Sequence, residues 1–211
     1  MASSATRLIL VRHGEAEGNR ELRYLGASDV PLTARGQAQA GLLAEAVRAL
    51  GPAALYTSPL QRARQTASAI AAATHLEPQP LDALREMDFG AWERLSRAEV
   101  VARDPAVLAA WERGADWTPP DGESLTQVGA RITACAELLA ARHPSQTIAL
   151  VSHVGPIKAL VCAALDLPPT GARRMWLDTA SVSLVEWRTD SPSSGVLRLF
   201  NATSHLDALP R

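Results

Sequence analysis

Arg12, His13, Arg62 and His153 share a position in the sequence: each comes at or shortly after the end of a short apolar run. A guanidinium group offers a fork of N–H donors that matches the oxygens of a phosphate group, and the free N–H groups of a helix N-terminus suit the same anion. If the four residues meet in space, the chemistry that they favour is the binding of a phosphate dianion.

Taken one at a time, these residues have ordinary explanations. An arginine in the first turn of a helix is usually solvated, and a single histidine after a strand is more often structural than catalytic. Only their shared position indicates a functional site, because ligands of parallel sheets bind at the carboxyl ends of the strands.

The apolar runs, and the helical spacing between them, predict the elements that would bring these residues together. Uninterrupted apolar runs are typical of strands buried on both faces. Strands are predicted over residues 8–11, 53–56 and 147–151, followed by 181–187 and 196–200 as an antiparallel edge. Four helices are predicted. The first has Leu43, Ala46, Val47 and Leu50 on its inward face. The second runs from a capping box at Ser58–Gln61 to about Ala73, the third from a capping box at Ser124–Gln127 to Arg142, and the fourth begins at Pro156. This alternation predicts an α/β fold, a three-layer αβα sandwich with a mostly parallel central sheet.

The segment from about residue 88 to residue 122 departs from this pattern. Its periodicity is weak, and charges alternate with Trp92, Trp111 and Trp117. We interpret it as a short helical insertion, a lid on a single domain that spans residues 1–211. The tryptophans are expected to pack the lid onto the core rather than to stack on a substrate ring. Residues 191–195 are predicted to form a loop.

Length and composition bound the class of protein. Hydrophobic residues make up 47% of the 211 residues and charged residues 20%, which is typical of a globular chain with a conventional core. The 21 basic and 22 acidic residues nearly cancel, so no broad positive field would hold the protein on nucleic acid or on an anionic membrane. The sequence shows no signal peptide and no apolar stretch near the roughly 18 residues of a transmembrane helix. We therefore expect a soluble, cytoplasmic protein.

Other residues with chemical potential receive structural interpretations. Cys135 and Cys162 lie far apart in apolar helical patterns without metal-ligand spacing, so we expect buried, reduced thiols. Lys158, the only lysine, is interpreted as solvated, with a substrate contact as the alternative, and Glu15 is interpreted as a support for the site. Neither a metal nor a cofactor is expected. The expected partner is a small phosphorylated substrate, and the sequence leaves a homodimer open.

Five sequence blocks, in order, resemble the histidine phosphatase superfamily, in the branch that contains the cofactor-dependent phosphoglycerate mutases. The blocks are Arg12-His13-Gly14-Glu15 with Asn19, residues 29–36 (DVPLTARG), residues 58–67 (SPLQRARQTA), residues 84–93 (LREMDFGAWE) and Val151-Ser152-His153. They cover the chain from about residue 7 to residue 165, which makes the resemblance specific.

The resemblance implies a role for each matching residue. His13 would be the nucleophile that takes the phosphoryl group, and Arg12, Arg62 and His153 would bind its oxygens. Glu86 would donate a proton to the leaving group. Asn19 would be a further contact near the phosphoryl group.

Elementary chemistry is consistent with these roles. Phosphoryl transfer depends mainly on positioning and on charge that complements the equatorial oxygens. To attack, His13 needs one bare ring nitrogen, and we expect its other nitrogen to donate to a backbone carbonyl, most simply that of Gly14. Glu86 can donate a proton only if its carboxyl stays protonated near the working pH. The same carboxylate would then activate the water that hydrolyses phospho-His13, with optimal rates on the acidic side of neutrality.

Within the superfamily, the chain looks more like a phosphatase than a mutase. Mutases of this branch carry a longer insertion with paired arginines that bind the substrate carboxylate, whereas the insertion here holds single, scattered arginines, and Arg94 replaces the usual glycine after Glu93. Residues 122–124 and 152–158 are more similar to α-ribazole phosphatases and to acid-phosphatase domains fused to ribonuclease H. The sequence therefore predicts a phosphomonoesterase, with a phosphoglycerate mutase as the alternative.

Two hypotheses from other classes stay open. His13, Glu86 and His153 could together bind zinc in a metallohydrolase, although two neighbouring arginines make such a site electrostatically poor. The same pocket could also bind a phosphorylated ligand without turning it over.

Overall fold

The computed structural model describes residues 5–113, 118–188 and 195–209. In this part of the chain six strands form one sheet in the order β3-β2-β4-β1-β5-β6. The strands are β1 (Thr6–Arg12), β2 (Ala54–Thr57), β3 (Pro78–Pro80), β4 (Thr147–Ser152), β5 (Val182–Trp187) and β6 (Val196–Ala202). Strands β1 to β4 pair in parallel, whereas β5 and β6 pair antiparallel. The predicted α/β fold, the mostly parallel sheet and the antiparallel edge are confirmed.

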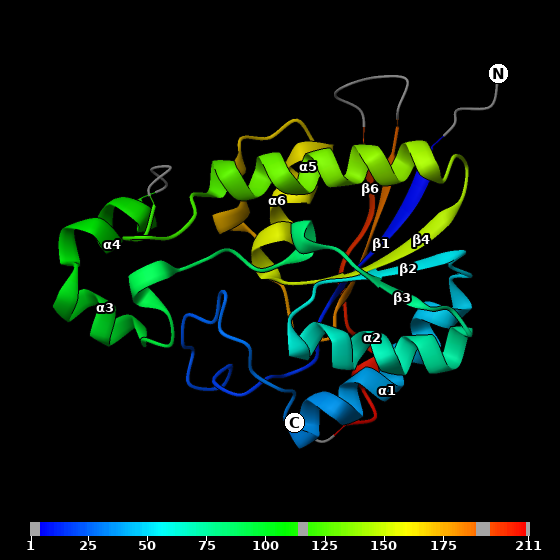
Figure 1. Ribbon diagram of the computed structural model, residues 1–211, viewed down its shortest axis with the longest axis horizontal. Coiled ribbons are helices and arrows are strands. Elements are labelled where there is room, and N and C mark those ends of the chain that lie inside the picture. The colour runs from blue at the N-terminus through cyan, green and yellow to red at the C-terminus, as the bar shows by residue number, and fades with distance from the viewer. Residues whose placement is uncertain (1–4, 114–117, 189–194, 210–211) are drawn as a thin grey trace.

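Helices cover both faces of the sheet because its central strands are apolar on both sides. Leu8 and Leu10 of β1 belong to a core shared with α5 (Leu125–Arg142) and α6 (Val154–Ala164). Ile9 and Val11 point the other way, into a core shared with α1 (Ala34–Ala49) and α2 (Gln61–Thr74). Figure 1 shows these two helix pairs on opposite sides of the sheet. The three layers place the carboxyl ends of β1, β2 and β4 at one edge.

The helix starts agree with the sequence at one capping box and differ at the other. Ser124 and Gln127 form the predicted reciprocal cap of α5. At α2 the prediction is wrong: the helix begins at Gln61, and its N-cap is Leu60, without a side-chain cap. The Ser58 hydroxyl accepts the N–H of Leu60 at 3.3 Å and also lies 2.8 Å from a ring nitrogen of His153. The N–H of Gln61, which the predicted capping box assigned to Ser58, donates to Asp29 instead.

Smaller differences between the predicted and the observed elements arise where the local sequence pattern is weak. Helix α6 begins at Val154, two residues before the predicted start. Strand β3 went unpredicted because its three residues, Pro-Gln-Pro, carry no apolar alternation. In α1, Leu43 and Val47 are buried as predicted, but Ala46 is only partly buried.

The segment predicted as an insertion forms a small helical unit beside the sheet. It holds a 3₁₀ turn (Gly90–Trp92), α3 (Arg97–Arg103) and α4 (Pro105–Glu112), and Figure 1 shows α3 and α4 projecting away from the sandwich. Trp92 is fully buried and packs with Val100 and Leu108. Trp92 therefore packs the unit internally, in a cluster apart from the two cores of the sandwich, whereas the sequence predicted that it would pack the lid onto the core. Trp117 and most of the predicted 191–195 loop lie outside the described residues, as does most of the N-terminal lead.

None of the helices in the described ranges is both long enough and apolar enough to cross a membrane.

Candidate active site

The carboxyl ends of β1, β2 and β4 bring His13, Arg62 and His153 together. These strands are neighbours in the parallel part of the sheet, so the loops that follow them share one edge. The imidazole ring centroids of His13 and His153 are 5.0 Å apart. Arg62, the second residue of α2, has its Nε 3.3 Å from His13 Nε2. The convergence predicted from the strand ends is what the structure shows.

The tautomer of His13 is determined by its backbone neighbour. His13 Nδ1 lies 2.7 Å from the carbonyl oxygen of Gly14, which can only accept, so Nδ1 carries the proton and Nε2 bears a lone pair. This is the hydrogen bond expected from the sequence. Burial lowers the pKa of His13 well below its usual value, and the charges of Arg62 and Arg12 lower it further. The ring is neutral, and its bare nitrogen accepts the Nε–H of Arg62.

The guanidinium group of Arg62 is held by the loop of residues 25–28. Its Nη1 donates to the carbonyl of Ser28 at 2.7 Å, and its Nη2 donates to the carbonyls of Leu25 and Gly26 at 3.1 and 2.9 Å. The Glu93 carboxylate accepts the N–H groups of Ala27 and Ser28 in the same loop. A charge that is almost fully buried is thereby fixed beside His13.

Two buried nitrogens of the site have no hydrogen-bond partner among the described residues. They are Arg12 Nε and His153 Nδ1. His153 uses its other nitrogen on Ser58 Oγ, and Arg12 uses Nη1 on the carbonyl of Leu177. Burial lowers the pKa of Arg12 to about 10, which leaves it charged at neutral pH. Unpaired buried polar atoms are costly, so Arg12 Nε suits an anionic oxygen, and His153 Nδ1 suits another when it carries the ring proton.

Glu86 supplies a carboxyl whose proton has a defined position. Its Oε1 accepts the N–H groups of Met87 and Gly155, at 2.8 and 2.9 Å. Its Oε2 accepts no hydrogen bond from any residue that the structure describes. Burial raises the pKa of Glu86 above its usual value, although these two N–H groups and the charge of Arg62 oppose the shift. When the carboxyl is protonated, its hydrogen therefore lies on Oε2, the oxygen without a hydrogen bond from the described residues.

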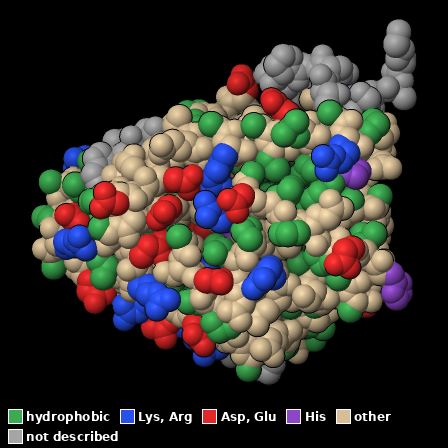
Figure 2. Space-filling view, viewed as in Figure 1, with side chains coloured by type: hydrophobic (Ala, Val, Ile, Leu, Met, Phe, Trp, Pro, Cys, Tyr) green, Lys and Arg blue, Asp and Glu red, His purple; other side chains and the backbone are tan. Residues whose placement is uncertain are grey.

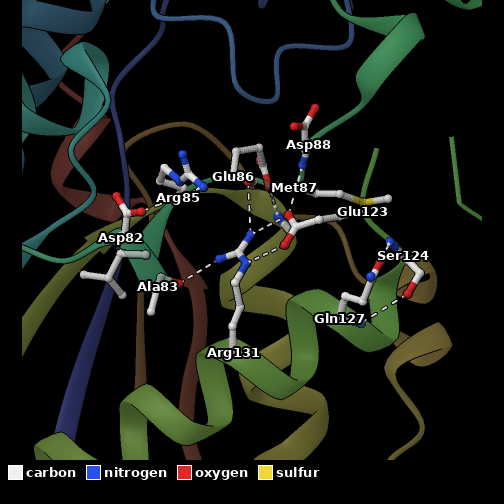
Figure 3. A network of polar contacts seen from close by, with 12 residues as sticks. Asp82, Ala83, Arg85, Glu86, Met87, Asp88, Glu123, Ser124, Gln127 and Arg131 are labelled. Carbon is white, nitrogen blue, oxygen red and sulfur yellow. Dashed lines mark hydrogen bonds and ion pairs between the residues drawn. The ribbon is translucent and has the colours of Figure 1, made fainter. Parts of the chain in front are cut away.

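A partly buried ion pair, Arg131–Glu123, positions the backbone around Glu86. Arg131 of α5 donates to the carbonyls of Ala83 and Glu86, at 2.7 and 3.0 Å, and forms two parallel hydrogen bonds with Glu123. Glu123 in turn accepts the N–H of Asp88. Figure 3 shows the Arg131 guanidinium between Glu123 and the loop that carries Glu86. This pair was not predicted, because no local pattern links Glu123 and Arg131 to the loop around Glu86, which they reach only in the folded chain.

Gly155 permits the contact between α6 and Glu86, so Gly155→Ala tests the placement of the carboxyl. A Cβ at Gly155 would lie 2.5 Å from Glu86 Oε1 and 3.4 Å from Met87 Cβ, and the backbone there is helical. We expect the variant to fold with a little-changed melting temperature but to lose about a hundredfold in kcat/KM for a phosphomonoester, because a displacement near 1 Å can cost that much. Gly41→Ala, where a Cβ meets nothing within 4 Å, is the matched control. Equal activity of the two variants would contradict this placement.

The remaining residues singled out from the sequence lie to the side. Asn19 accepts the N–H of Ala16 at 2.8 Å, and within the described residues no hydrogen bond joins it to His13 or the arginines; its contact with a substrate stays a prediction. Glu15 accepts from Thr33 and Arg20. Across the described part of the chain, no three His, Cys, Asp or Glu side chains are grouped so that they could hold a metal ion. The zinc hypothesis thus has no ligand set there.

A parallel α/β edge that presents two arginines, a neutral histidine with a bare nitrogen and a carboxyl with a raised pKa is typical of a protein that handles phosphoryl groups. The chain belongs to the histidine phosphatase superfamily (branch 1), whose family model matches residues 8–201. The family membership suggested by the five sequence blocks is confirmed.

Curated proteins with different names are similar in sequence to this chain over nearly its whole length. The "Bifunctional protein Rv2228c" of Mycobacterium tuberculosis is 41% identical over 202 residues, which are 95% of this chain and 55% of the relative. The chain therefore spans about half the length of that relative. Phosphoserine phosphatase 1 of Hydrogenobacter thermophilus is 36% identical, with 95% of this chain and 94% of the relative covered. A probable phosphoglycerate mutase GpmB of an Enterobacter species is also 36% identical, over 96% and 95%.

Solved structures give the same picture. A mycobacterial glucosyl-3-phosphoglycerate phosphatase superposes with a TM-score of 0.84 at 30% identity, covering 93% of this chain and 99% of that one. The α-ribazole phosphatase of Shigella flexneri superposes with a TM-score of 0.81 at 28% identity, covering 93% and 96%. The structural neighbours are phosphatases of the superfamily, and the prediction of an enzyme of this class is confirmed.

Proposed function

We propose that the chain is a phosphomonoester phosphatase that works through a phosphohistidine intermediate on a small phosphorylated metabolite. The observation that carries the proposal is the bare Nε2 of a neutral His13, set beside Arg62 in a site where the buried nitrogens Arg12 Nε and His153 Nδ1 have no partner among the described residues. A nucleophile and the charge to bind a phosphoryl group are thus in one place.

The first half-reaction transfers the phosphoryl group to the enzyme. His13 Nε2 attacks phosphorus, the bond from phosphorus to the leaving oxygen breaks, and that oxygen takes its electron pair and the proton of Glu86 Oε2. Arg12, Arg62 and His153 complement the charge on the three equatorial oxygens. The hydrogen bond from His13 Nδ1 to Gly14 stabilises the positive charge that develops on the ring.

The second half-reaction restores the enzyme. Water attacks phosphorus, the ionised Glu86 takes a proton from that water, and the N–P bond breaks to release inorganic phosphate and neutral His13. One carboxyl thus acts as acid and then as base, as its position beside the reacting group allows.

A phosphoglycerate mutase is the second candidate, because relatives carry that name. The arginines of the helical insertion argue against it. Arg97 pairs with Glu112, and Arg103 donates to the carbonyl of Ala91. These arginines hold the insertion together and are not grouped for a substrate carboxylate, which supports the phosphatase.

A substrate panel tests the proposal. The purified protein is given sugar phosphates, phosphoglycerates and nucleotide-like monophosphates, and released inorganic phosphate is measured. We expect release from at least one class, with 2- and 3-phosphoglycerate interconverted more slowly than they are hydrolysed. Interconversion of the two phosphoglycerates without release from any phosphomonoester would establish the mutase instead. Binding without turnover in every case would establish the binding module.

Partners and location complete the proposal. We infer a small phosphorylated substrate, no nucleic-acid or membrane partner and a cytoplasmic location, and a homodimer is kept as an alternative to a monomer. On the face drawn in Figure 2, basic and acidic side chains are intermingled, which supports a small ligand over a polyanion.

A further inference from the structure

A cavity of about 140 Å³ lies beside the carboxyl of Glu86. Its walls are mostly apolar and come from both the core and the helical insertion; they include Met87, Trp111 and Val154, with Glu86 and Lys158 as polar members. An apolar cavity of about 150 Å³ can hold a benzene ring. We call this space the Glu86 cavity; it has room for one six-membered ring or a chain of similar size.

Lys158 brings an ammonium group into this cavity. The sequence suggested a solvated side chain, but Lys158 is partly buried and lines the cavity together with Glu86. It forms no hydrogen bond or ion pair with any described residue. Burial lowers its pKa and the charge of Arg12 lowers it further, while Glu86 and Cys162 oppose the shift, so the ammonium is desolvated near another cation without a hydrogen-bonded anion among the described residues. An anion in the cavity would provide that offset.

The position of Glu86 assigns the cavity to the alcohol portion of the substrate. A general acid must reach the oxygen that bridges phosphorus and the leaving group. The phosphoryl group lies with His13, so the rest of the molecule extends from that bridging oxygen on the Glu86 side. This step rests on the proposed function.

We propose that the Glu86 cavity receives the leaving group and that Lys158 binds a negatively charged substituent on it. The substrate class is then the phosphomonoesters of small, largely apolar alcohols or phenols that carry an anion, either a carboxylate or a second phosphate. Polyhydroxylated sugars fit poorly, because apolar walls would leave their hydroxyl groups unpaired.

The test compares matched aryl phosphates. The compounds are 3-carboxyphenyl phosphate, its methyl ester, 1,3-phenylene bisphosphate and phenyl phosphate, and kcat/KM is measured for each with the wild type, Lys158→Met and Lys158→Arg. The methyl ester has the shape of the carboxylate without its charge. We expect the wild type to prefer the carboxylate or the bisphosphate over the methyl ester by about tenfold to a hundredfold, the range of a hydrogen bond to a charged group. Lys158→Met should bring the ratio close to one, and Lys158→Arg should retain most of it.

The readout is a ratio within each variant, so a general loss of activity cancels. Arg48→Met removes an exposed cation of α1, which pairs with Glu45, and should leave the ratio unchanged. Lys158→Gln replaces Lys158→Met if the latter unfolds early in a thermal melt.

A higher rate with the bisphosphate than with the carboxylate identifies a second phosphate as the anion, and the reverse order identifies a carboxylate. A wild-type ratio near one, or an unchanged ratio in Lys158→Met, overturns the role of Lys158 while hydrolysis of phenyl phosphate still supports the phosphatase. No hydrolysis of any compound by the wild type counts against the phosphatase itself.

Discussion

Replacing His13 with asparagine should reduce phosphate release to the background of the assay, a loss of at least about 10⁴-fold. Removal of a catalytic nucleophile commonly lowers kcat by this factor or more. The positive charge of the site cannot compensate, because no other group is placed to accept the phosphoryl group. Asparagine places a polar group near the position of His13 Nδ1, so a hydrogen bond to the Gly14 carbonyl is retained. The measurement is kcat for the best substrate of the panel.

Labelling separates loss of the nucleophile from loss of the fold. The wild type, quenched during turnover of a ³²P-labelled substrate, should retain phosphate that is stable to base and labile to acid, as expected for a bond from nitrogen to phosphorus. His13→Asn should retain none. His75→Asn is a suitable control, because His75 is exposed at the end of α2 with φ 59, where asparagine is well tolerated. Acid-labile label on His13→Asn would place the nucleophile elsewhere.

The sequence predicted the fold well because its signals are local. Runs such as Leu8–Val11 are apolar on every residue, which only a strand buried on both faces requires, and the structure buries all four. The position of His13 and His153 just after such strands then constrains them to one edge of the sheet. The strongest local signals were therefore also the ones that located the site.

The parts that could not be predicted depend on contacts between distant segments. Ser58 reads as a helix cap, and only the fold shows that its hydroxyl engages His153, 95 residues later. Arg131 sits in the middle of a predicted helix, where an arginine is usually solvated, yet it binds the loop around Glu86. The helical position of Lys158 likewise favours a solvated side chain, yet the structure places it in the lining of the Glu86 cavity. In each case the preference of the residue type was overruled by its tertiary neighbours.

Replacing Glu86 with glutamine should slow hydrolysis of alkyl phosphates far more than that of p-nitrophenyl phosphate. An alkoxide is too basic to leave without a proton, whereas p-nitrophenolate is stable unprotonated, so only the alkyl substrates need the acid. General acid catalysis contributes about 10²–10⁴-fold, and we expect a loss of that size for an alkyl phosphate. Glutamine keeps an acceptor for the N–H groups of Met87 and Gly155, so the geometry is preserved. Glu137→Gln, exposed on α5, is the control.

The pH dependence of kcat/KM should change in the same variant. The acid must be protonated and His13 must be neutral, so the active form exists between the lowered pKa of His13 and the raised pKa of Glu86. For the wild type, activity on alkyl phosphates falls as the pH rises through the pKa of Glu86, and it falls at low pH as His13 takes a proton. Glu86→Gln should lose the alkaline fall and keep the acidic one. Similar losses on both kinds of substrate, with the alkaline fall intact, would show that Glu86 positions the site without donating the proton.

Pre-steady-state kinetics of the same variant then isolate the second half-reaction. With p-nitrophenyl phosphate, transfer to His13 needs no acid, but the attack of water on the phosphohistidine still needs a base that glutamine cannot supply. The intermediate should therefore accumulate, and p-nitrophenol should appear in a burst of close to one equivalent per site followed by slow turnover. Addition of formate, a small carboxylate, should speed the slow phase if it enters the space left by the acid. A single carboxyl that serves both half-reactions predicts the burst; separate groups for the two steps predict none.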